Sequence, residues 1–488
     1  MRVVETALRA LIENRFGMLG LVVVSLLALY GVAYATRPAP AAAPAPQPSR
    51  VPVESVTAVC PDLAGAAVSV VAPGQNGKSG QKGAGEVAVT ELGEDGEPVG
   101  TLTETGRLWQ KTPKGRTGPL LVAGDGAVAT GLEAAQTGTQ TSGALRGLAG
   151  VRCVEPSASA WLVGPGPAAA DVTLYLANAD SAPASVRLAV YAGEGTVLDD
   201  HGLVLEPGEH RAIPLKDLAP SPLIMAVEVR TSKGRVAVAA RAAMSGGRGV
   251  DWLPQAAPPA TRVVVPGIPG GGGKRELYVA APGELDAVVS IKAVTADGAY
   301  AMKNRETLEV PAGSVASLDL TTGIGGQAAA LVLTSETPVV AGMTVTATGS
   351  LPDVAFSAGA GPIDLGSVVA DNRASGGDKP DKAATLVLTA PEKAGRVRVT
   401  VIPARGSAPK PLEVSIPAAR TREVELPAAR GPFSVALTPL PGSGPVYGGR
   451  VLTDRLGDGL LITLQPLAPA RVWTLVPPLT DSPVTVLP

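Results

Sequence analysis

The sequence predicts an all-β protein, in which tandem immunoglobulin-like β-sandwich repeats follow one N-terminal transmembrane helix and a Pro/Ala-rich stalk. Three observations support this. The 488 residues include 59 Gly and 46 Pro but only 3% aromatic residues, and short alternating apolar runs end at Gly or Pro, as strands do. Sequence landmarks recur at separations of 103–109 residues, and one early segment of 20 residues carries no charge. A chain this long also exceeds one ordinary core, so several domains of ~100–150 residues are expected.

The uncharged segment, Phe16–Ala35, is long enough to cross a hydrocarbon core of ~30 Å as a helix. Three arginines precede it, Arg2, Arg9 and Arg15, which places the N-terminus in the cytosol and the bulk of the chain outside the cell. The run exceeds the ~7–15 residues of a signal-peptide core, so an uncleaved anchor is favoured. Ala33-Tyr34-Ala35 nevertheless fits a cleavage site, and secretion after cleavage behind Ala35 is the alternative.

The next segment, TRPAPAAAPAPQPSRVP from Thr36 to Pro52, cannot build a hydrophobic core. Proline-rich sequence of this kind favours the extended polyproline conformation, at ~3.1 Å per residue. We therefore predict a stalk that separates the later domains from the membrane.

The chain has two cysteines, Cys60 and Cys153, and both follow the membrane segment. In an oxidising compartment such a pair most simply forms a disulfide. Two cysteines without neighbouring histidines fall short of a zinc site, so no metal is predicted. The cysteines bracket the least regular repeat, and reduction is therefore expected to expose Val56–Glu155 to proteases first.

Four repeats follow the stalk. Leu174, Leu277 and Leu386 occupy equivalent places in the last three copies, and a more degraded copy precedes them. The predicted boundaries are 1–15 for the cytoplasmic N-terminus, 16–35 for the transmembrane helix or signal anchor, 36–54 for the linker, and 55–155, 156–256, 257–362 and 363–488 for the repeats. About seven strands in ~105 residues are typical of an immunoglobulin-like sandwich. A β-propeller is the alternative, but it would need two blades per repeat.

The stretch PGIPGGGGKREL, Pro266–Leu277, resembles a phosphate-binding loop only superficially. That motif requires G-x-x-x-x-G-K-[ST] between a strand and a helix. Here Ile268 replaces the first glycine, Arg275 replaces the hydroxyl residue, and a strand follows. The stretch is predicted to be a linker loop, without a nucleotide cofactor.

Other chemistry-bearing residues are few. His201 and His210 are the only histidines, and they lie with Asp199, Asp200 and Glu209 in DDHGLVLEPGEH, which we interpret as a solvated hairpin. GEDGEP at Gly93–Pro98 lacks the ligand spacing of a calcium loop. The S-x-x-K match at Ser79 lacks the partner motifs of penicillin-binding enzymes. No cofactor and no catalytic residue are predicted, and the net charge of −2 without a basic stripe argues against nucleic acid.

The stretch CVEPSASAWLVGPG, together with LYLAN and VDWLPQA, resembles an uncharacterised family of actinobacterial exported proteins, the domain of unknown function 5719 family. The residues that carry the resemblance are Cys153, Trp161, Gly164, Gly166, Asn178, Asp251 and Trp252. The resemblance implies an N-terminal membrane segment and mostly structural motifs. It implies no established activity, although genes of the family often stand beside envelope glycosyltransferases.

We therefore expect a non-catalytic, membrane-anchored extracytoplasmic scaffold or binding protein of the bacterial cell envelope, which assists cell-wall or polysaccharide assembly. An envelope protein or a cell-wall glycan is the expected partner. The protein partner is preferred, because 4 Trp, 7 Tyr and 3 Phe offer few aromatic platforms for sugars. The alternative is an envelope hydrolase or transferase, with Asp199–His210 as its best candidate site.

Overall fold

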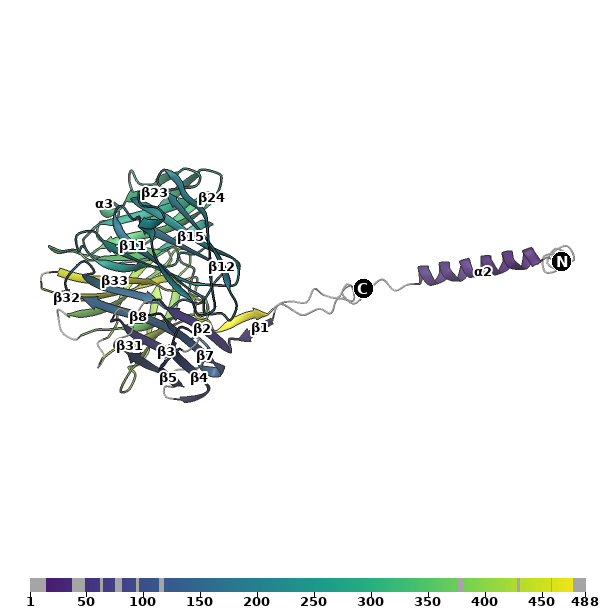
Figure 1. Cartoon of the computed structure of the whole chain (residues 1–488), viewed down its shortest axis with the longest axis horizontal. Coiled ribbons are helices and arrows are strands. Elements are labelled where there is room, and N and C mark those ends of the chain that lie inside the picture. Colours follow the sequence, from purple (N-terminus) through teal and green to yellow (C-terminus); the bar gives the residue numbers. More distant parts are fainter. Residues whose placement is uncertain are drawn as a thin grey trace. The chain divides into compact units, whose positions relative to one another are not determined.

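The computed structural model describes residues 15–36, 49–61, 65–74, 81–93, 96–113, 118–375, 381–427, 431–457 and 459–476. Helix α2 (Arg15–Ala35) is followed by strands almost throughout, which confirms the all-β prediction (Figure 1). Within the described part of the chain, α2 contains the one candidate membrane span, Phe16–Ala35, with a mean hydropathy of 2.3. A membrane anchor and a signal sequence both fit this helix.

The chain divides into two compact units, and Pro52–Thr474 forms the larger one. The other unit comprises Met1–Val51 and Leu475–Pro488. Strand β1 (Ser49–Pro52) pairs with β34 (Trp473–Val476). All four repeats therefore belong to a single compact unit.

Each repeat range contains eight consecutive strand positions, compared with the roughly seven that the sequence predicts. Repeat 1 holds β2 (Ser55–Cys60), β3 (Ala67–Ala72), β4 (Gln81–Glu91), β5 (Pro98–Thr105), β6 (Arg107–Lys111), β7 (Leu120–Asp125), β8 (Glu133–Gln140) and β9 (Gly147–Arg152). Repeat 2 holds β10 (Ser159–Pro165), β11 (Ala170–Ala177), β12 (Ala184–Ala192), β13 (Gly195–Leu205), β14 (His210–Pro214), β15 (Ile224–Lys233), β16 (Ala237–Met244) and β17 (Val250–Leu253).

Repeat 3 holds β18 (Ala260–Ile268), β19 (Arg275–Ala281), β20 (Ala287–Thr295), β21 (Ala299–Ala301), β22 (Thr307–Val310), β23 (Ser314–Asp319), the short helix α3 (Thr321–Ile324), β24 (Ala329–Thr346) and β25 (Val354–Ala358). Its β24 supplies both the sixth and the seventh strand positions. Repeat 4 holds β26 (Ser367–Asn372), β27 (Lys382–Ala390), β28 (Gly395–Pro403), β29 (Leu412–Ile416), β30 (Arg420–Glu425), β31 (Phe433–Pro439), β32 (Tyr447–Leu456) and β33 (Gly459–Pro466). Single-turn helices η2 (Gly126–Val128) and η3 (Leu215–Asp217) complete the structure.

The four repeats share one topology. In each, the first, sixth, third and fourth strands form one antiparallel sheet, as in β10-β15-β12-β13. The fifth, second, seventh and eighth strands form a second sheet, as in β14-β11-β16-β17. The specific immunoglobulin-like arrangement stays a prediction, but a common strand order explains why the sequence landmarks recur at nearly constant spacing.

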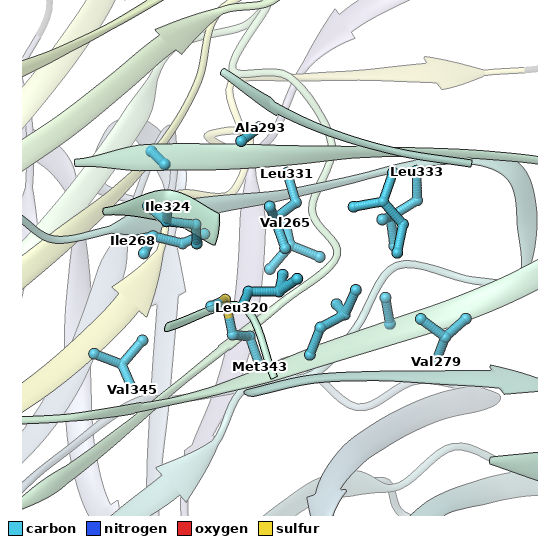
Figure 2. Packing of buried hydrophobic residues seen from close by; sticks show 14 of the residues in the cluster. Val265, Ile268, Val279, Ala293, Leu320, Ile324, Leu331, Leu333, Met343 and Val345 are labelled. Atoms are coloured by element: carbon cyan, nitrogen blue, oxygen red, sulfur yellow. The ribbon is translucent and has the colours of Figure 1, made fainter. Parts of the chain in front are cut away.

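The two sheets of a repeat face each other across a shared apolar core. In repeat 3, Leu331 and Leu333 of the first sheet lie opposite Val279 and Met343 of the second, and all four are fully buried (Figure 2). Strands that alternate inward apolar and outward residues build such a core because successive side chains point to opposite faces. Repeats 1, 2 and 4 are therefore sandwiches of two four-stranded sheets, and in repeat 3 the long strand β24 joins the two layers.

The repeats also bury apolar surface against one another and close into a ring. The first sheet of each repeat packs on the second sheet of the next: Val59 on Ala237 between repeats 1 and 2, Trp161 with Tyr278 between 2 and 3, Val264 with Tyr447 between 3 and 4, and Val368 with Val71 between 4 and 1. Eight sheets in a closed ring are a feature of propellers. Here, however, the chain of each repeat passes back and forth between two layers, whereas consecutive strands of a propeller blade lie in one sheet.

Repeat 1 is fastened at both of its ends. Cys60 in β2 and Cys153 after β9 form a disulfide with a Cα–Cα distance of 4.2 Å, as the sequence predicts. After β33 the chain returns to repeat 1, where the Gly131 amide donates to the Arg471 carbonyl over 2.9 Å. The Val53 amide similarly donates to the Val472 carbonyl over 3.3 Å. Residues near the end of the unit thereby contact repeat 1.

The glycine-rich stretch contains the connection between β18 and β19, which pair with different parts of the long strand β24. The buried guanidinium of Arg275 donates to the carbonyls of Pro269 and Thr346 at 3.3 and 3.1 Å. Gly273 has a φ of +101°, and a Cβ there would stand 2.0 Å from the Thr346 carbonyl oxygen. Glycine at position 273 thus permits both the positive φ and the close approach of the Thr346 backbone.

Gly273→Ala is expected to destabilise the protein by roughly 1–2 kcal/mol more than Gly271→Ala. Both positions have positive φ, but a Cβ at Gly271 would meet nothing within 4 Å. The control variant therefore measures the backbone strain alone. Urea denaturation of both variants tests this, and equal stabilities would show that the close approach to Thr346 costs nothing.

Candidate functional site

The eighth strands of the four repeats meet at the centre of the ring. β9 contacts β17 and β33, and β25 contacts the same two strands. All four repeats therefore contribute one strand to the axis, where a site shared among them can form.

Asp251 in β17 ties three of these strands together. Its Oδ1 accepts from the Gly150 amide of β9 at 3.0 Å and from the Thr463 hydroxyl of β33 at 2.9 Å. Its other carboxylate oxygen has no hydrogen-bond partner among the described residues. Burial raises the pKa of Asp251 well above its ordinary value, and the nearby Asp353 carboxylate adds to the shift.

Asp353, directly before β25, makes an equivalent junction. Its Oδ2 accepts from the Leu148 amide of β9 at 3.0 Å and from the Ile462 amide of β33 at 2.9 Å. Burial raises the pKa of Asp353 to about 6. The amide donors and Arg146 favour the ionised form, but they do not outweigh the loss of hydration.

Asp353→Asn is expected to stabilise the protein at pH 8 by roughly 2 kcal/mol and to leave it nearly unchanged at pH 4.5. Because the folded-state pKa of Asp353 is raised, the wild-type protein keeps its full stability below pH ~4. It loses this part of its stability as the pH rises through about 6 and the carboxyl group ionises. Asparagine mimics the protonated form and keeps one oxygen for the two amides. Thermal denaturation between pH 4.5 and 8 measures the effect, and parallel curves for the two proteins would contradict it.

At the carboxyl ends of the central strands lies a cavity of about 600 Å³. Four segments line it, one from each repeat: Gly150–Ser157, Trp252–Pro258, Gly359–Gly361 and Leu464–Arg471. We call this the axial cavity. Its volume falls within the ~300–1,000 Å³ of small-molecule sites.

Three of the four tryptophans line the axial cavity. Trp161 is buried and stacks on Tyr191, with ring centroids 5.7 Å apart. Trp252 is also buried, and its ring lies 5.2 Å from that of Tyr175. Trp473 is 48% exposed. The lining therefore includes two buried tryptophans, each held by a tyrosine, and one exposed tryptophan.

The charged groups of the cavity wall form two pairs. Glu133 accepts from both Nε and Nη2 of Arg152, the latter over 2.7 Å, and Glu155 lies 3.1 Å from Arg471. Burial raises the pKa of Glu133, although Arg152 opposes the shift. Each carboxylate has a guanidinium partner, so these four groups carry no net charge.

Behind the wall, Arg450 of β32 is fully buried. Its Nη2 donates to Oε1 of Gln465 over 3.0 Å, whereas Nε and Nη1 have no partner among the described residues. Burial lowers the pKa of Arg450 to about 10. Gln465 lines the cavity and its Nε2 has no partner within the described structure. The contact with Arg450 fixes which end of that amide is the free donor.

The remaining residues of the family motif have structural surroundings. The buried Asn178 donates to the Ala182 and Leu205 carbonyls at 2.9 and 3.0 Å, which holds the turn after β11. A Cβ on Gly164 would stand 2.7 Å from Leu253, and one on Gly166 would stand 2.3 Å from the Pro222 carbonyl oxygen. These positions favour glycine because neighbouring atoms leave no room for a side chain.

The segment Asp199–His210 does not form the hairpin that the sequence suggested. His201 lies in β13 of one sheet and His210 begins β14 of the other, and both are exposed. Glu209 accepts from Arg211 over 2.7 Å. Within the residues that the structure covers, no group of three or more His, Cys, Asp or Glu could hold a metal ion. The S-x-x-K serine, Ser79, and part of GEDGEP, 94–95, lie outside the described residues.

Asp353, Arg450 and Gln465 are not among the residues that the sequence predicts for a site. A signal existed for Asp353, because V-D-W at Val250 and P-D-V at Pro352 place an aspartate at the start of the same strand about one repeat apart. Arg450 and Gln465 gave no signal, since each stands alone in an ordinary strand. Their proximity depends on the pairing of β32 with β33.

The fold and the site define an all-β protein whose repeats close into a ring around one shared cavity. Residues 109–427, more than half of the chain, match the model of the Family of unknown function (DUF5719). The chain belongs to this family. No curated protein matches the sequence. The matched range includes Trp161, Asp251 and Asp353 but ends before Gln465.

Proposed function

We propose that this protein is a non-catalytic, membrane-anchored extracytoplasmic binding protein or scaffold of the bacterial cell envelope, which assists cell-wall or polysaccharide assembly. The axial cavity carries the proposal, because all four repeats line one pocket of ligand size. The apolar helix α2 and the Cys60–Cys153 disulfide support an anchored position outside the cytosol.

Chemical crosslinking in intact cells, followed by mass spectrometry of the purified adducts, tests this role. We expect adducts with envelope proteins, including a membrane glycosyltransferase. These adducts should form with membrane-impermeant crosslinkers as well as with permeant ones. Adducts with cytosolic proteins alone would overturn both the location and the role.

The rival enzymatic function makes a separate prediction. Substituting His201→Ala and His210→Ala together is expected to leave growth and envelope phenotypes unchanged, because the two exposed side chains lie on different sheets. Complementation of a deletion strain measures this. Loss of complementation by a variant with unchanged thermal stability would favour the hydrolase or transferase.

A further inference from the structure

The shape and lining of the axial cavity restrict its ligand to a mainly apolar body. Its lining combines Trp161 and Trp252 with valine and leucine residues and with Pro156, Pro254 and Pro466. Such a lining gains free energy by burying hydrocarbon rather than by hydrogen bonding.

The charges of the wall disfavour a charged ligand. Glu133 and Glu155 are each neutralised by an arginine of the same wall, Arg152 and Arg471. An anion or a cation entering the cavity would lose hydration without gaining a free counter-charge, unless it broke one of these pairs. The cavity therefore selects against net charge.

One polar side chain of the cavity lining, that of Gln465, has a hydrogen-bond donor that is unsatisfied among the described residues. Gln465 is 5% exposed and lines the cavity, and Arg450 occupies its amide oxygen. Its Nε2 donor has no partner within the described part of the chain. A buried donor is costly until an acceptor satisfies it, so a carbonyl, ether or hydroxyl oxygen on the ligand would bind here.

We propose that the axial cavity binds an uncharged, largely apolar ligand whose oxygen accepts a hydrogen bond from the Gln465 side chain. The apolar body packs on the valine, leucine, proline and tryptophan residues of the lining, and the arginine–glutamate pairs disfavour charged analogues. This proposal rests on the proposed binding role and names the class of ligand for it. A lipid of the membrane and a free apolar metabolite share this chemistry.

A photoaffinity experiment on the full-length protein in phosphatidylcholine nanodiscs tests the proposal. The probe is a neutral decyl alcohol bearing an aliphatic diazirine, and its matched charged analogue is the corresponding carboxylate at pH 8. We expect the alcohol to label the cavity peptides Gly150–Ser157 and Trp252–Pro258, and the carboxylate to label them at least tenfold less. Competition by monoacylglycerol in the bilayer or by soluble hexanol then distinguishes a lipid from a free ligand.

Two neighbouring positions supply matched variants. Ser159 lines the cavity whereas Ala158 does not, and both are exposed. Ser159→Trp is expected to reduce labelling at least tenfold, and Ala158→Trp to leave it unchanged. Gln465→Glu keeps an oxygen for Arg450 but removes the free donor, so it should reduce labelling severalfold. Thermal denaturation of each variant distinguishes a loss of binding from a loss of folding. Ala257→Trp is a second variant in which a large side chain is placed in the cavity.

Equal labelling by the alcohol and the carboxylate would overturn the proposal, as would labelling that persists in folded Ser159→Trp and Ala257→Trp proteins. Labelling of the cavity by neither probe would also overturn it. This measurement uses purified protein, whereas the proposed function is tested by crosslinking in cells. A failure of the ligand proposal can therefore be distinguished from a failure of the proposed function.

Discussion

Replacing both Cys60 and Cys153 with alanine is expected to lower the free energy of unfolding by about 4–5 kcal/mol. The bridge closes a loop with a sequence separation of 93 residues, and a crosslink of that length removes much of the entropy of the unfolded chain. Repeat 1 depends on it most, because among the described residues its apolar core is the smallest of the four.

Urea denaturation and limited proteolysis measure the two parts of this prediction. In the double variant, and in the reduced wild-type protein, we expect the first cleavages within 56–155. Adding reductant to the double variant serves as the control and should change nothing further. Free thiols in the protein purified without reductant would contradict the bridge. Simultaneous cleavage of all repeats would show instead that the closed ring unfolds as one cooperative unit.

Gln465→Leu is expected to destabilise the protein by about 3 kcal/mol, because it removes the hydrogen-bond acceptor of the buried Arg450 guanidinium. Gln465→Glu should instead match or exceed the wild-type stability, since a carboxylate supplies both an acceptor and a counter-charge. The double variant Arg450→Met/Gln465→Leu should recover most of the loss, because replacing both partners with apolar groups leaves no unsatisfied charge.

Chemical denaturation of the wild-type protein, Gln465→Leu, the single variant Arg450→Met and the double variant completes a double-mutant cycle. A strong positive coupling between positions 450 and 465 is the expected result. If Gln465→Leu and Gln465→Glu were equally stable, the contact would contribute nothing to folding, and Gln465 would have to be explained by binding alone.

The sequence alone was sufficient to predict the all-β class and the apolar N-terminal helix. It also indicated the Cys60–Cys153 pairing and a loop within Pro266–Leu277, although the loop covers only 269–274 and the ends of the stretch belong to β18 and β19. These features depend on local patterns: alternation along a strand, an uncharged run of 20 residues, and glycines where the backbone turns. A family resemblance carried by Trp161 and Asp251 also lies in the sequence, and the match over 109–427 agrees with it.

Only the tertiary structure decided how the repeats combine. Whether Val368 packs on Val71, some 300 positions away, depends on closure of the ring and has no local signature. The same holds for the site. Asp251 contacts Gly150 and Thr463, and Gln465 faces Arg450, because strands from different places in the chain meet at one axis. The periodicity of a strand indicates which of its faces is buried, but not which other strand covers that face. The cavity is formed by contacts between strands that are distant in the sequence, so no local pattern predicts it.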